Sequence, residues 1–385
     1  MKESQGLRPG YRRQVFDTAR RVVVKVGSAV LTTENGLDLE LIQGLARQVS
    51  GLLDAGREVV MVSSGAVAAG RRVIAASVEL NGLPARQAAS AVGQSRLMHA
   101  YDEAFAGQGK VTAQILVSKD GLESRRRFLH ARNTLATLLS WRAVPIVNEN
   151  DTVAVEELEF GDNDFLASLI VNLVEADLMV NLTSAEGVFS ANPDRDAGAH
   201  CLECIPDIAG LDLDALCSGK STVGTGGMYS KLLSARRVAQ LGVPSLILSG
   251  RTPDALTRVF GGEDLGTLIV PQDKAVSRRK YWMAYNQDVV GVITVDGGAV
   301  EALVTGGKSL LPAGVLDVAG SFEAGGLVRI KSRDGRSLGV GLSNYDSSEL
   351  AMIKGRHSSE IPGVLGRPAY PEVVHRNNLL LDAAL

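Results

Sequence analysis

The stretch VVVKVGSAVL, residues 22–31, decides the fold of the first two thirds of the chain. It begins with valines interrupted only by Lys25, and Gly27 ends the run. β-Branched residues favour strands, and an unbroken apolar run is typical of a strand that is buried on both faces. The stretch therefore predicts a central strand of a parallel sheet with a lysine close to its carboxyl end.

More apolar runs of this kind follow, and stretches with helical periodicity separate them. In LELIQGLARQVSGLLDAG (39–56) and NTLATLLSWRA (133–143), apolar residues recur three and four positions apart. This alternation predicts an α/β fold over residues 21–265, a mostly parallel sheet sandwiched between helices. The predicted strands are 22–26, 59–63, 143–148, 178–182 and 245–249.

The sequence pattern changes after residue 265. ITVDGGAVEALVTGG (293–307) and LVRIKSRDGRSLGVGLS (327–343) contain short β-rich runs broken by glycines and Asp-Gly turns. They predict a small β-rich domain over residues 285–372. The rest of the chain is predicted to form a flexible N-terminal extension, a linker and a C-terminal tail, at 1–20, 266–284 and 373–385.

Composition excludes several classes of protein. With 45% hydrophobic and 22% charged residues, the 385-residue chain can bury enough surface to fold, which excludes long disorder. The 40 basic and 43 acidic residues nearly balance, and the apolar runs are too short to span a bilayer. Three cysteines are too few for a disulfide framework, and no apolar leader is evident at the N-terminus. We therefore expect a cytoplasmic protein without membrane contact.

Several common nucleotide and hydrolase motifs are absent from the sequence. GGKS at 306–309 and SGKS at 218–221 resemble the end of a P-loop, but Ala302 and Asp214 stand where its first glycine belongs. No GxGxxG follows a predicted strand, and there is no HExxH or GxSxG.

Two predicted strands end in residues suited to anions. A buried lysine such as Lys25 is costly unless an anion meets it, and open α/β sheets bind ligands at the carboxyl ends of their strands. In VMVSSGAVAAG (60–70), a strand ends at Ser63, Ser64 and Gly65 before a helix whose first N–H groups can bind an anion. A lysine that reaches solvent along the sheet, and serines that only cap the helix, remain alternatives.

Two polar clusters follow. IVNENDTV (146–153) places Asp151 just beyond a strand, where its carboxylate could accept hydrogen bonds from an ammonium group or simply form a turn. FGDNDFLASLIVNL (160–173) begins a helix with Asp162, Asn163 and Asp164. These residues suit helix capping, and a carboxylate among them could also hold two lysines in place.

The strongest local signal is STVGTGGMYSKLLSARRVAQLG (221–242). Its three clustered glycines allow the backbone to approach a phosphate closely, and a helix follows. Lys231 lies in the first turns of that helix, although lysine is normally favoured at the opposite end. This placement indicates a contact with bound phosphate. A flexible loop before an amphipathic helix is the alternative.

Taken together, six motifs in order make the chain resemble the amino-acid kinase family, over nearly all of residues 21–371. VNEND followed by GDND resembles the members that phosphorylate glutamate. The stretch 290–320, VGVITVDGGAVEALVTGGKSLLPAGVLDVAG, resembles a PUA domain. The six motifs are VVVKVGS (22–28), VSSGAVAAG (62–70), RFLHARNTL (127–135), VPIVNENDTV (144–153), GDND (161–164) and GTGGMYSK (224–231).

The resemblance implies ATP-dependent phosphorylation of the γ-carboxylate of L-glutamate, the first step of proline biosynthesis, with ATP and Mg²⁺ as cofactors. Lys25 and Lys231 would be catalytic, and Asp164 would orient both; no metal ligand is assigned. The implied glutamate-binding residues are Ser64, Gly65, Asp151 and Asn163. The implied ATP-binding residues are Lys25, Gly27, Thr183, Ser184, Thr225, Gly226, Gly227, Met228, Tyr229, Ser230 and Lys231.

The sequence departs from the family's pattern at three positions. Ser184 and Asn192 stand where Asp is usual, and His130 stands where Asn is frequent. The Ser184 change concerns contacts with the nucleotide or a metal. It leaves the glutamate-binding motifs untouched.

The resemblance also implies partners. These are proline as a feedback inhibitor, a homo-oligomer (dimer or tetramer), and a hand-off of the labile product to glutamate-5-semialdehyde dehydrogenase. Another family member, of the N-acetylglutamate or aspartate kinase type, and an RNA-associated protein that acts through its PUA domain remain alternatives. RNA binding is disfavoured because residues 277–385 carry 12 Lys/Arg and 11 Asp/Glu and are nearly neutral.

Cys201 and Cys204 form a single CxxC beside His200, with Cys217 further on. Four such ligands could bind zinc. Because no second CxxC is present, we interpret the three cysteines as ordinary thiols.

Overall fold

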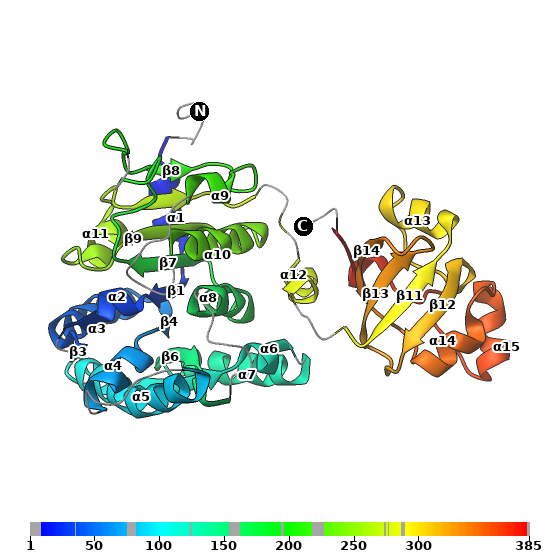
Figure 1. The fold of residues 1–385 in the computed structure, drawn as a ribbon, viewed down its shortest axis with the longest axis horizontal. Helices are drawn as coiled ribbons and strands as arrows, with labels where there is room; N and C mark the ends of the chain where they lie inside the picture. Colours follow the sequence, from blue (N-terminus) through cyan, green and yellow to red (C-terminus); the bar gives the residue numbers. More distant parts are fainter. Residues whose placement is uncertain are drawn as a thin grey trace. The chain divides into compact units, whose positions relative to one another are not determined.

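The computed structural model divides the chain into two compact units, Met1–Ala275 and Val276–Leu385, each with its own buried core (Figure 1). We call them the N-terminal and the C-terminal unit. The structure describes residues 9–34, 36–74, 82–123, 125–153, 162–193, 196–217, 227–272, 275, 277–285 and 289–382.

An eight-stranded sheet forms the centre of the N-terminal unit, in the order β5-β6-β4-β1-β7-β9-β10-β8. Six strands are parallel, whereas β10 runs antiparallel to β9 and β8 follows β10. All five predicted strands are present, and the predicted α/β fold is confirmed. The strands are β1 (Arg21–Val26), β4 (Glu58–Ser63), β5 (Thr112–Val117), β6 (Val144–Glu149), β7 (Leu178–Thr183), β8 (Cys204–Ile205), β9 (Ser245–Ser249) and β10 (Thr267–Ile269).

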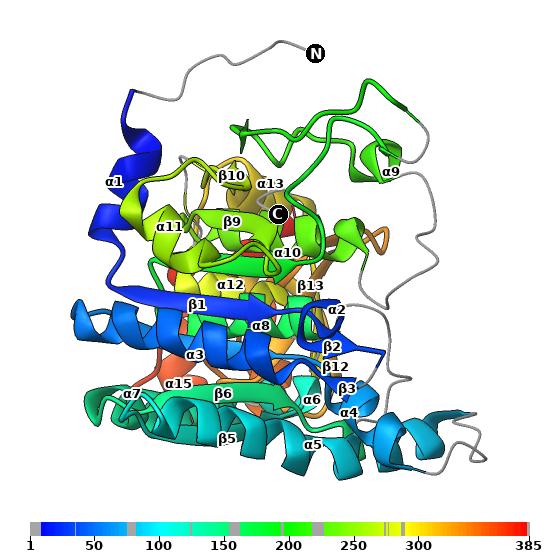
Figure 2. The same cartoon turned by 90° about the vertical axis from the view of Figure 1, so that its left-hand side faces the viewer.

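Helices cover both faces of this sheet (Figures 1 and 2). Side chains alternate along a strand, and Val22, Val24 and Val26 of β1 join the core on the face covered by α3, α5 and α11. Lys25 therefore points to the opposite face, which is covered by α7, α8 and α10. The bounds are α3 (Leu39–Asp54), α5 (Gly82–Ala106), α7 (Arg125–Ser140), α8 (Asp162–Leu173), α10 (Met228–Gln240) and α11 (Ala255–Gly261).

Helix α4 (Ala66–Val73) crosses α5 at backbone contact. A Cβ atom built on Gly70 would lie 1.7 Å from the carbonyl oxygen of Ala89, and one built on Gly93 would lie 1.8 Å from that of Ala66. Gly65, immediately before α4, has φ 103°, a left-handed conformation that glycine adopts readily. Glycines thus permit both the turn after β4 and the close helix crossing that follows it.

Residues 11–18, predicted as part of a flexible extension, instead form helix α1 (Tyr11–Thr18). Phe16 is 1% exposed and packs edge-on against Phe260, with ring centroids 5.3 Å apart. Arg12 donates hydrogen bonds to the carbonyl oxygens of Glu203 and Leu265. This segment is ordered by contacts with residues far along the chain, and a local sequence pattern cannot reveal such contacts. The smaller elements of the unit are α2 (Ser28–Leu31), β2 (Thr32–Thr33), β3 (Gly36–Leu37), α6 (Lys119–Glu123), η1 (Asp151–Val153) and α9 (Leu213–Leu216).

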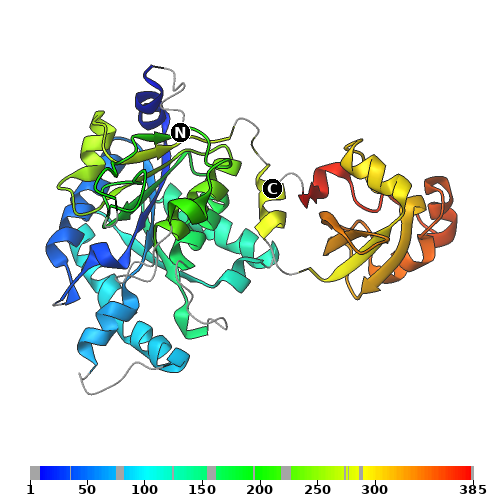
Figure 3. The ribbon, with the colours of Figure 1, turned by 45° about the horizontal axis from the view of Figure 1, so that its top comes forward.

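The C-terminal unit is a five-stranded sheet in the order β12-β11-β13-β14-β15, with helices beside it (Figure 3). Leu303, Leu350 and Ile361, from α13, α14 and α15, pack in one core, and Met283 of α12 packs in another against Leu327. The bounds are α12 (Arg278–Tyr285), β11 (Gly291–Val295), α13 (Gly297–Val304), η2 (Pro312–Gly314), β12 (Val315–Gly320), β13 (Leu327–Ser332), β14 (Ser337–Leu342), α14 (Ser347–Ile353), η3 (Ser358–Glu360), α15 (Ile361–Leu365), η4 (Arg376–Asn378) and β15 (Leu379–Leu381).

Two of the expected segment boundaries differ from the structure. The expected linker, 266–284, contains β10, which pairs with β9, and most of α12, which packs on the C-terminal sheet. The expected tail, 373–385, contains β15, which pairs with β14. Within the described ranges, no helix is both long and apolar enough to cross a membrane.

Candidate active site

Lys25 lies near the end of the central strand β1, between Val62 of β4 and Asn181 of β7. Its side chain is 5% exposed although lysine is charged at neutral pH. Such burial is tolerated only where a carboxylate or another anion compensates the charge. The structure places that carboxylate on α8.

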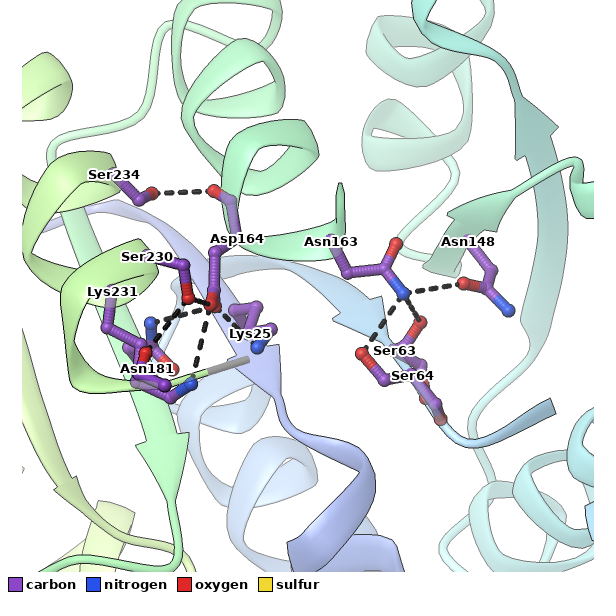
Figure 4. Close-up of polar contacts among 11 residues, drawn as sticks. Lys25, Ser63, Ser64, Asn148, Asn163, Asp164, Asn181, Ser230, Lys231 and Ser234 are labelled. Carbon is purple, nitrogen blue, oxygen red and sulfur yellow. Dashed lines mark hydrogen bonds and ion pairs between the residues drawn. The ribbon is translucent and has the colours of Figure 1, made fainter. Parts of the chain in front are cut away.

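Asp164 forms ion pairs with two lysines that are far apart in the sequence (Figure 4). Its Oδ1 lies 2.5 Å from Lys25 Nζ, and its Oδ2 lies 3.3 Å from Lys231 Nζ. The Asp164 and Lys231 side chains are 1% and 6% exposed. The predicted convergence of these three residues is therefore present in the structure.

Further donors hold the Asp164 carboxylate in place. Ser230 Oγ donates to Oδ2 at 2.6 Å, and Asn181 Nδ2 donates to Oδ1 at 3.3 Å. Ser234 Oγ donates to the Asp164 carbonyl oxygen at 2.6 Å, which ties α10 to the start of α8. The guanidinium of Arg237 also lies over the ring of a residue on α8, Phe165, 4.3 Å from its centroid. These contacts fix the register of Lys231 against Asp164.

The electrostatics of this group are dominated by burial and by the three charges. Burial opposes the ionisation of Asp164, but Lys25 and Lys231 outweigh it and keep the pKa of Asp164 below its ordinary value. Burial lowers the pKa of Lys231, and Lys25 adds to this effect, while Asp164 opposes it. Two ammonium groups share one carboxylate, so with all three ionised one positive charge remains to meet an anion.

A second polar cluster surrounds Asn163, the residue before Asp164 (Figure 4). Asn163 Nδ2 lies 3.2 Å from the carbonyl oxygen of Ser63 and 3.0 Å from both Ser64 Oγ and Asn148 Oδ1. The Ser64 N–H donates to Val26 O at 3.1 Å, so this turn is attached to β1 as well. Predicted residues Ser64 and Asn163 are thus in direct contact.

Asp151 is at the start of η1, and Asn150 separates it from β6. Its Oδ2 accepts a hydrogen bond from Ser90 of α5. Burial raises the pKa of Asp151, and Ser90 and Arg86 oppose that rise. The carboxylate is thereby oriented by α5 and desolvated, as a partner for an ammonium group should be.

The residues predicted to bind the nucleotide lie at the ends of β1 and β7 and at the start of α10. The Gly27 N–H donates to Leu182 O at 3.0 Å. Thr183 is buried at the end of β7, and Ser184 after it is exposed. Gly227, Met228, Tyr229 and Ser230 begin α10, with Tyr229 42% exposed. Thr225 and Gly226 lie outside the described residues.

The described part of the chain does not form a metal site made of protein ligands alone. Among the residues that the structure describes, no group of three His, Cys, Asp or Glu side chains converges. Both oxygens of Asp164 are already engaged by lysine, serine and asparagine donors. Mg²⁺ commonly binds through substrate phosphates and one or two carboxylates. The chain thus offers no independent magnesium cage in these regions.

The CxxC cysteines lie near strands β8 and β10. Cys201 Sγ is 3.9 Å from Thr267 Oγ1, and burial raises the pKa of Cys204 to about 11. The Cys204 thiol is therefore protonated at neutral pH.

Sequence reasoning missed Asn181 and Gln94. Asn181 carried a signal, because it is a polar residue inside the buried run LMVNLT, as Lys25 is in its own strand. Gln94 carried none: it is one of many polar residues on α5, and only the tertiary structure brings it to Asn148.

The comparisons with known proteins agree with this geometry. The model of the amino acid kinase family matches residues 20–249, more than half of the chain. The chain belongs to the amino-acid kinase family. The PUA domain model matches residues 291–365, in the C-terminal unit. Both resemblances predicted from the sequence are confirmed.

Relatives in the amino-acid kinase family match almost the whole chain. Glutamate 5-kinase of Maridesulfovibrio salexigens is 59% identical, covering 97% of this chain and 99% of the relative. Glutamate 5-kinase of Syntrophus aciditrophicus is 45% identical, covering 96% of each chain. Among solved structures, a UMP kinase from Bacillus anthracis has a TM-score of 0.46 at 16% identity, covering 66% of this chain and 96% of that chain. The family assignment depends on the sequence comparisons.

Proposed function

We propose that this protein transfers the γ-phosphoryl group of ATP to the γ-carboxylate of L-glutamate, giving ADP and L-glutamyl 5-phosphate, in the first step of proline biosynthesis. The proposal depends on one observation: two polar clusters meet at Asn163 and Asp164, which are adjacent in the chain. Asp164 binds Lys25 and Lys231, and Asn163 binds Ser64. The similarity to curated glutamate 5-kinases over nearly the full chain supports the choice of substrate.

The attacking carboxylate needs no general base. Its pKa of about 4.3 in free glutamate means that it is ionised at neutral pH. The obstacle is the approach of this anion to the polyanionic phosphates. Lys25 and Lys231 neutralise that repulsion and the charge that develops on the phosphoryl oxygens, and Asp164 holds their spacing.

The nucleotide half of the site uses backbone and lysine donors. Gly27 and Gly227 have no side chain, and a Cβ at Gly27 would lie 3.9 Å from Lys25 Nζ, so the bare backbone leaves room for phosphate. Mg²⁺ bound together with ATP would shield the charge of the phosphates. Thr183, Ser184 and the residues from Thr225 to Tyr229 complete the nucleotide contacts.

The amino-acid half of the site selects the substrate by charge. Asp151, oriented by Ser90, pairs with the α-ammonium group. Ser64, Gly65 and Asn163 supply the other contacts to the amino acid. A blocked amine would leave the half-buried Asp151 carboxylate without its partner, and sites of this kind reject such analogues strongly.

An assay of ADP release tests the proposal with glutamate, N-acetylglutamate and aspartate as acceptors. We expect glutamate to be preferred over N-acetylglutamate by at least about 10²-fold in kcat/KM, because of the unpaired Asp151. Better turnover of N-acetylglutamate or aspartate would refute the assignment.

The same proposal carries expectations about partners. Proline inhibits the reaction, the protein forms a homo-oligomer in the cytoplasm, and the labile product passes to glutamate-5-semialdehyde dehydrogenase. Repeating the assay with and without proline tests the first of these.

A further inference from the structure

Three amide side chains, of which Gln94 and Asn148 are buried and Asn163 is half-buried, form a hydrogen-bonded row beside the proposed glutamate site. Asn163 Nδ2 donates to Asn148 Oδ1 at 3.0 Å, and Asn148 Nδ2 donates to Gln94 Oε1 at 2.8 Å. Asn148 is 2% exposed and Gln94 is 8% exposed. The row therefore runs from α8 across the end of β6 to α5.

Backbone groups fix the orientation of every amide in this row. The Glu149 N–H donates to Asn148 Oδ1 at 2.9 Å, and a backbone N–H can only donate. Asn148 must therefore direct its NH₂ group toward Gln94, and the atom of Gln94 that accepts this hydrogen bond must be Oε1. At the other end, the Ser63 carbonyl oxygen can only accept, so Asn163 must turn its NH₂ group toward it.

This arrangement leaves one free atom at each end of the row. Gln94 Nε2, a donor, and Asn163 Oδ1, an acceptor, are buried without a hydrogen-bond partner among the described residues. Buried polar atoms without partners are rare in native proteins, because each costs about 1–3 kcal/mol. A free donor and a free acceptor complement the carboxylate and ammonium groups of an α-amino acid.

Helix α5 places Gln94 on the side of the amino acid. Ser90 lies one turn before Gln94, on the same face of the helix, and it orients Asp151. Gly93, next to Gln94, is pressed against the backbone of α4, which begins directly after Ser64 and Gly65. The position of Gln94 is thus rigidly tied to residues that we assign to glutamate binding.

We infer that Gln94 is a further substrate-binding residue, whose Nε2 donates a hydrogen bond to the α-carboxylate of glutamate while its Oε1 holds Asn148. Asn163 Oδ1 accepts from the α-ammonium group at the other end of the row. This inference rests on the proposed function and deepens it.

The test replaces Gln94 by glutamate. Gln94→Glu retains an oxygen that accepts from Asn148, but it removes the donor and places an acceptor opposite the substrate carboxylate. At pH 8.5, which favours the ionised form of the introduced group, we expect KM for glutamate to rise about 10–100-fold. We expect KM for ATP to stay close to that of the wild type, whereas the melting temperature should fall because the ionised carboxylate is buried.

Gln48→Glu is the matched control. Gln48 on α3 is a half-buried amide, whose Oε1 accepts from the Leu256 N–H at 2.9 Å and whose Nε2 donates to Gly44 O at 3.2 Å. It lies outside the row, so we expect KM for glutamate to be unchanged.

Gln94→Met removes both Oε1 and Nε2 and keeps an unbranched side chain of similar length. It replaces Gln94→Glu as the test if that variant does not fold. We expect it to raise KM for glutamate about tenfold or more. An unchanged KM for glutamate in folded Gln94→Glu overturns the inference, even if Gln94→Met raises it, because Gln94 would then only position Asn148. If the wild type does not phosphorylate glutamate, the proposed function fails and this inference fails with it.

Discussion

At the scale of single residues, the central feature is one carboxylate between two lysines. A buried ion pair is weak evidence for stability, because the desolvation of the charges opposes their attraction. Three charged side chains that are each at most 6% exposed therefore indicate function rather than folding. In the proposed function, the phosphate of the nucleotide is the fourth partner of this group.

Replacing either lysine by alanine should reduce kcat on the order of 10²-fold or more, because a cation that stabilises the transferring phosphoryl group is lost. Lys25→Ala and Lys231→Ala are compared with Lys110→Ala, which breaks an ion pair with Asp54 outside the site. The ADP-release assay measures all three. Near-wild-type kcat in Lys231→Ala would refute the role that we give it.

The lowered pKa of Asp164 also predicts that the free energy of unfolding depends on pH in the acid range. Its pKa is below its ordinary value, so the folded protein binds fewer protons than the unfolded chain near pH 4. The stabilisation by ionised Asp164 is complete above the unfolded pKa of about 3.9 and is lost as pH falls through the lower folded pKa. The unfolding free energy of the wild type should therefore exceed that of Asp164→Asn near neutral pH, and this difference should disappear as pH falls below about 4.

Denaturant unfolding of both proteins between pH 7 and pH 3 measures this difference. A gap in unfolding free energy that stays constant over the whole range would show that the charge of Asp164 does not contribute.

At the scale of elements, the crossing of α4 and α5 determines where the amino-acid half of the site lies. α4 begins directly after Ser64 and Gly65, and α5 carries Ser90 and Gln94. Their backbones touch at Gly70 and Gly93, where no side chain fits. The two helices therefore act as one rigid support.

Gly93→Ala should separate the two helices and destabilise the protein by about 1–3 kcal/mol or more, as overpacking does. KM for glutamate should rise as well. Gly51→Ala on α3 is the control, because a Cβ there meets nothing within 4 Å. In a helix it should be neutral or stabilise by about 0.5–1 kcal/mol. Equal effects of the two substitutions on the melting temperature would contradict the close packing at Gly93.

The predictability of the elements follows their hydrophobic pattern. The five long central strands are visible because they are continuous apolar runs. Short strands such as β8 and β10 are not, because two or three residues carry no periodicity and pair only through the tertiary structure. Helix α1 depends in the same way on Phe260 and on carbonyl groups far along the chain.

The predictability of the site has the same limit. Lys25 and Asp164 stand out because charged residues interrupt apolar patterns or begin helices. Their partner Asn181 shares that signal and was overlooked. Gln94 has no local signal at all, since its contact with Asn148 joins residues of different elements.

At the scale of the whole molecule, the chain consists of two units with separate cores. All the residues that we place in the site belong to the N-terminal unit. Strand β10 belongs to it too, because Thr267 Oγ1 accepts from the Val188 N–H at 2.8 Å and donates to Leu202 O at 2.5 Å. The end of the kinase fold thus lies after β10 and before α12.

Two truncations test this boundary. A chain that ends at Ala275 should fold and release ADP with glutamate, because its core and site are complete. A chain that ends at Leu265 lacks β10 and should lose cooperative thermal unfolding. Loss of folding in the longer truncation would show that the C-terminal unit is needed for the kinase fold.

Asn163 and Asp164 are consecutive residues, yet they bind opposite halves of the site. Their Cα atoms are separated by a single peptide unit, about 3.8 Å, so neither cluster can slide relative to the other. In the proposed function, the span between the amino-acid backbone and the phosphate is therefore set by one helix terminus. An acid one methylene shorter than glutamate, held by its backbone groups, would stop short of the phosphorus atom, and no movement of α8 could bring it closer.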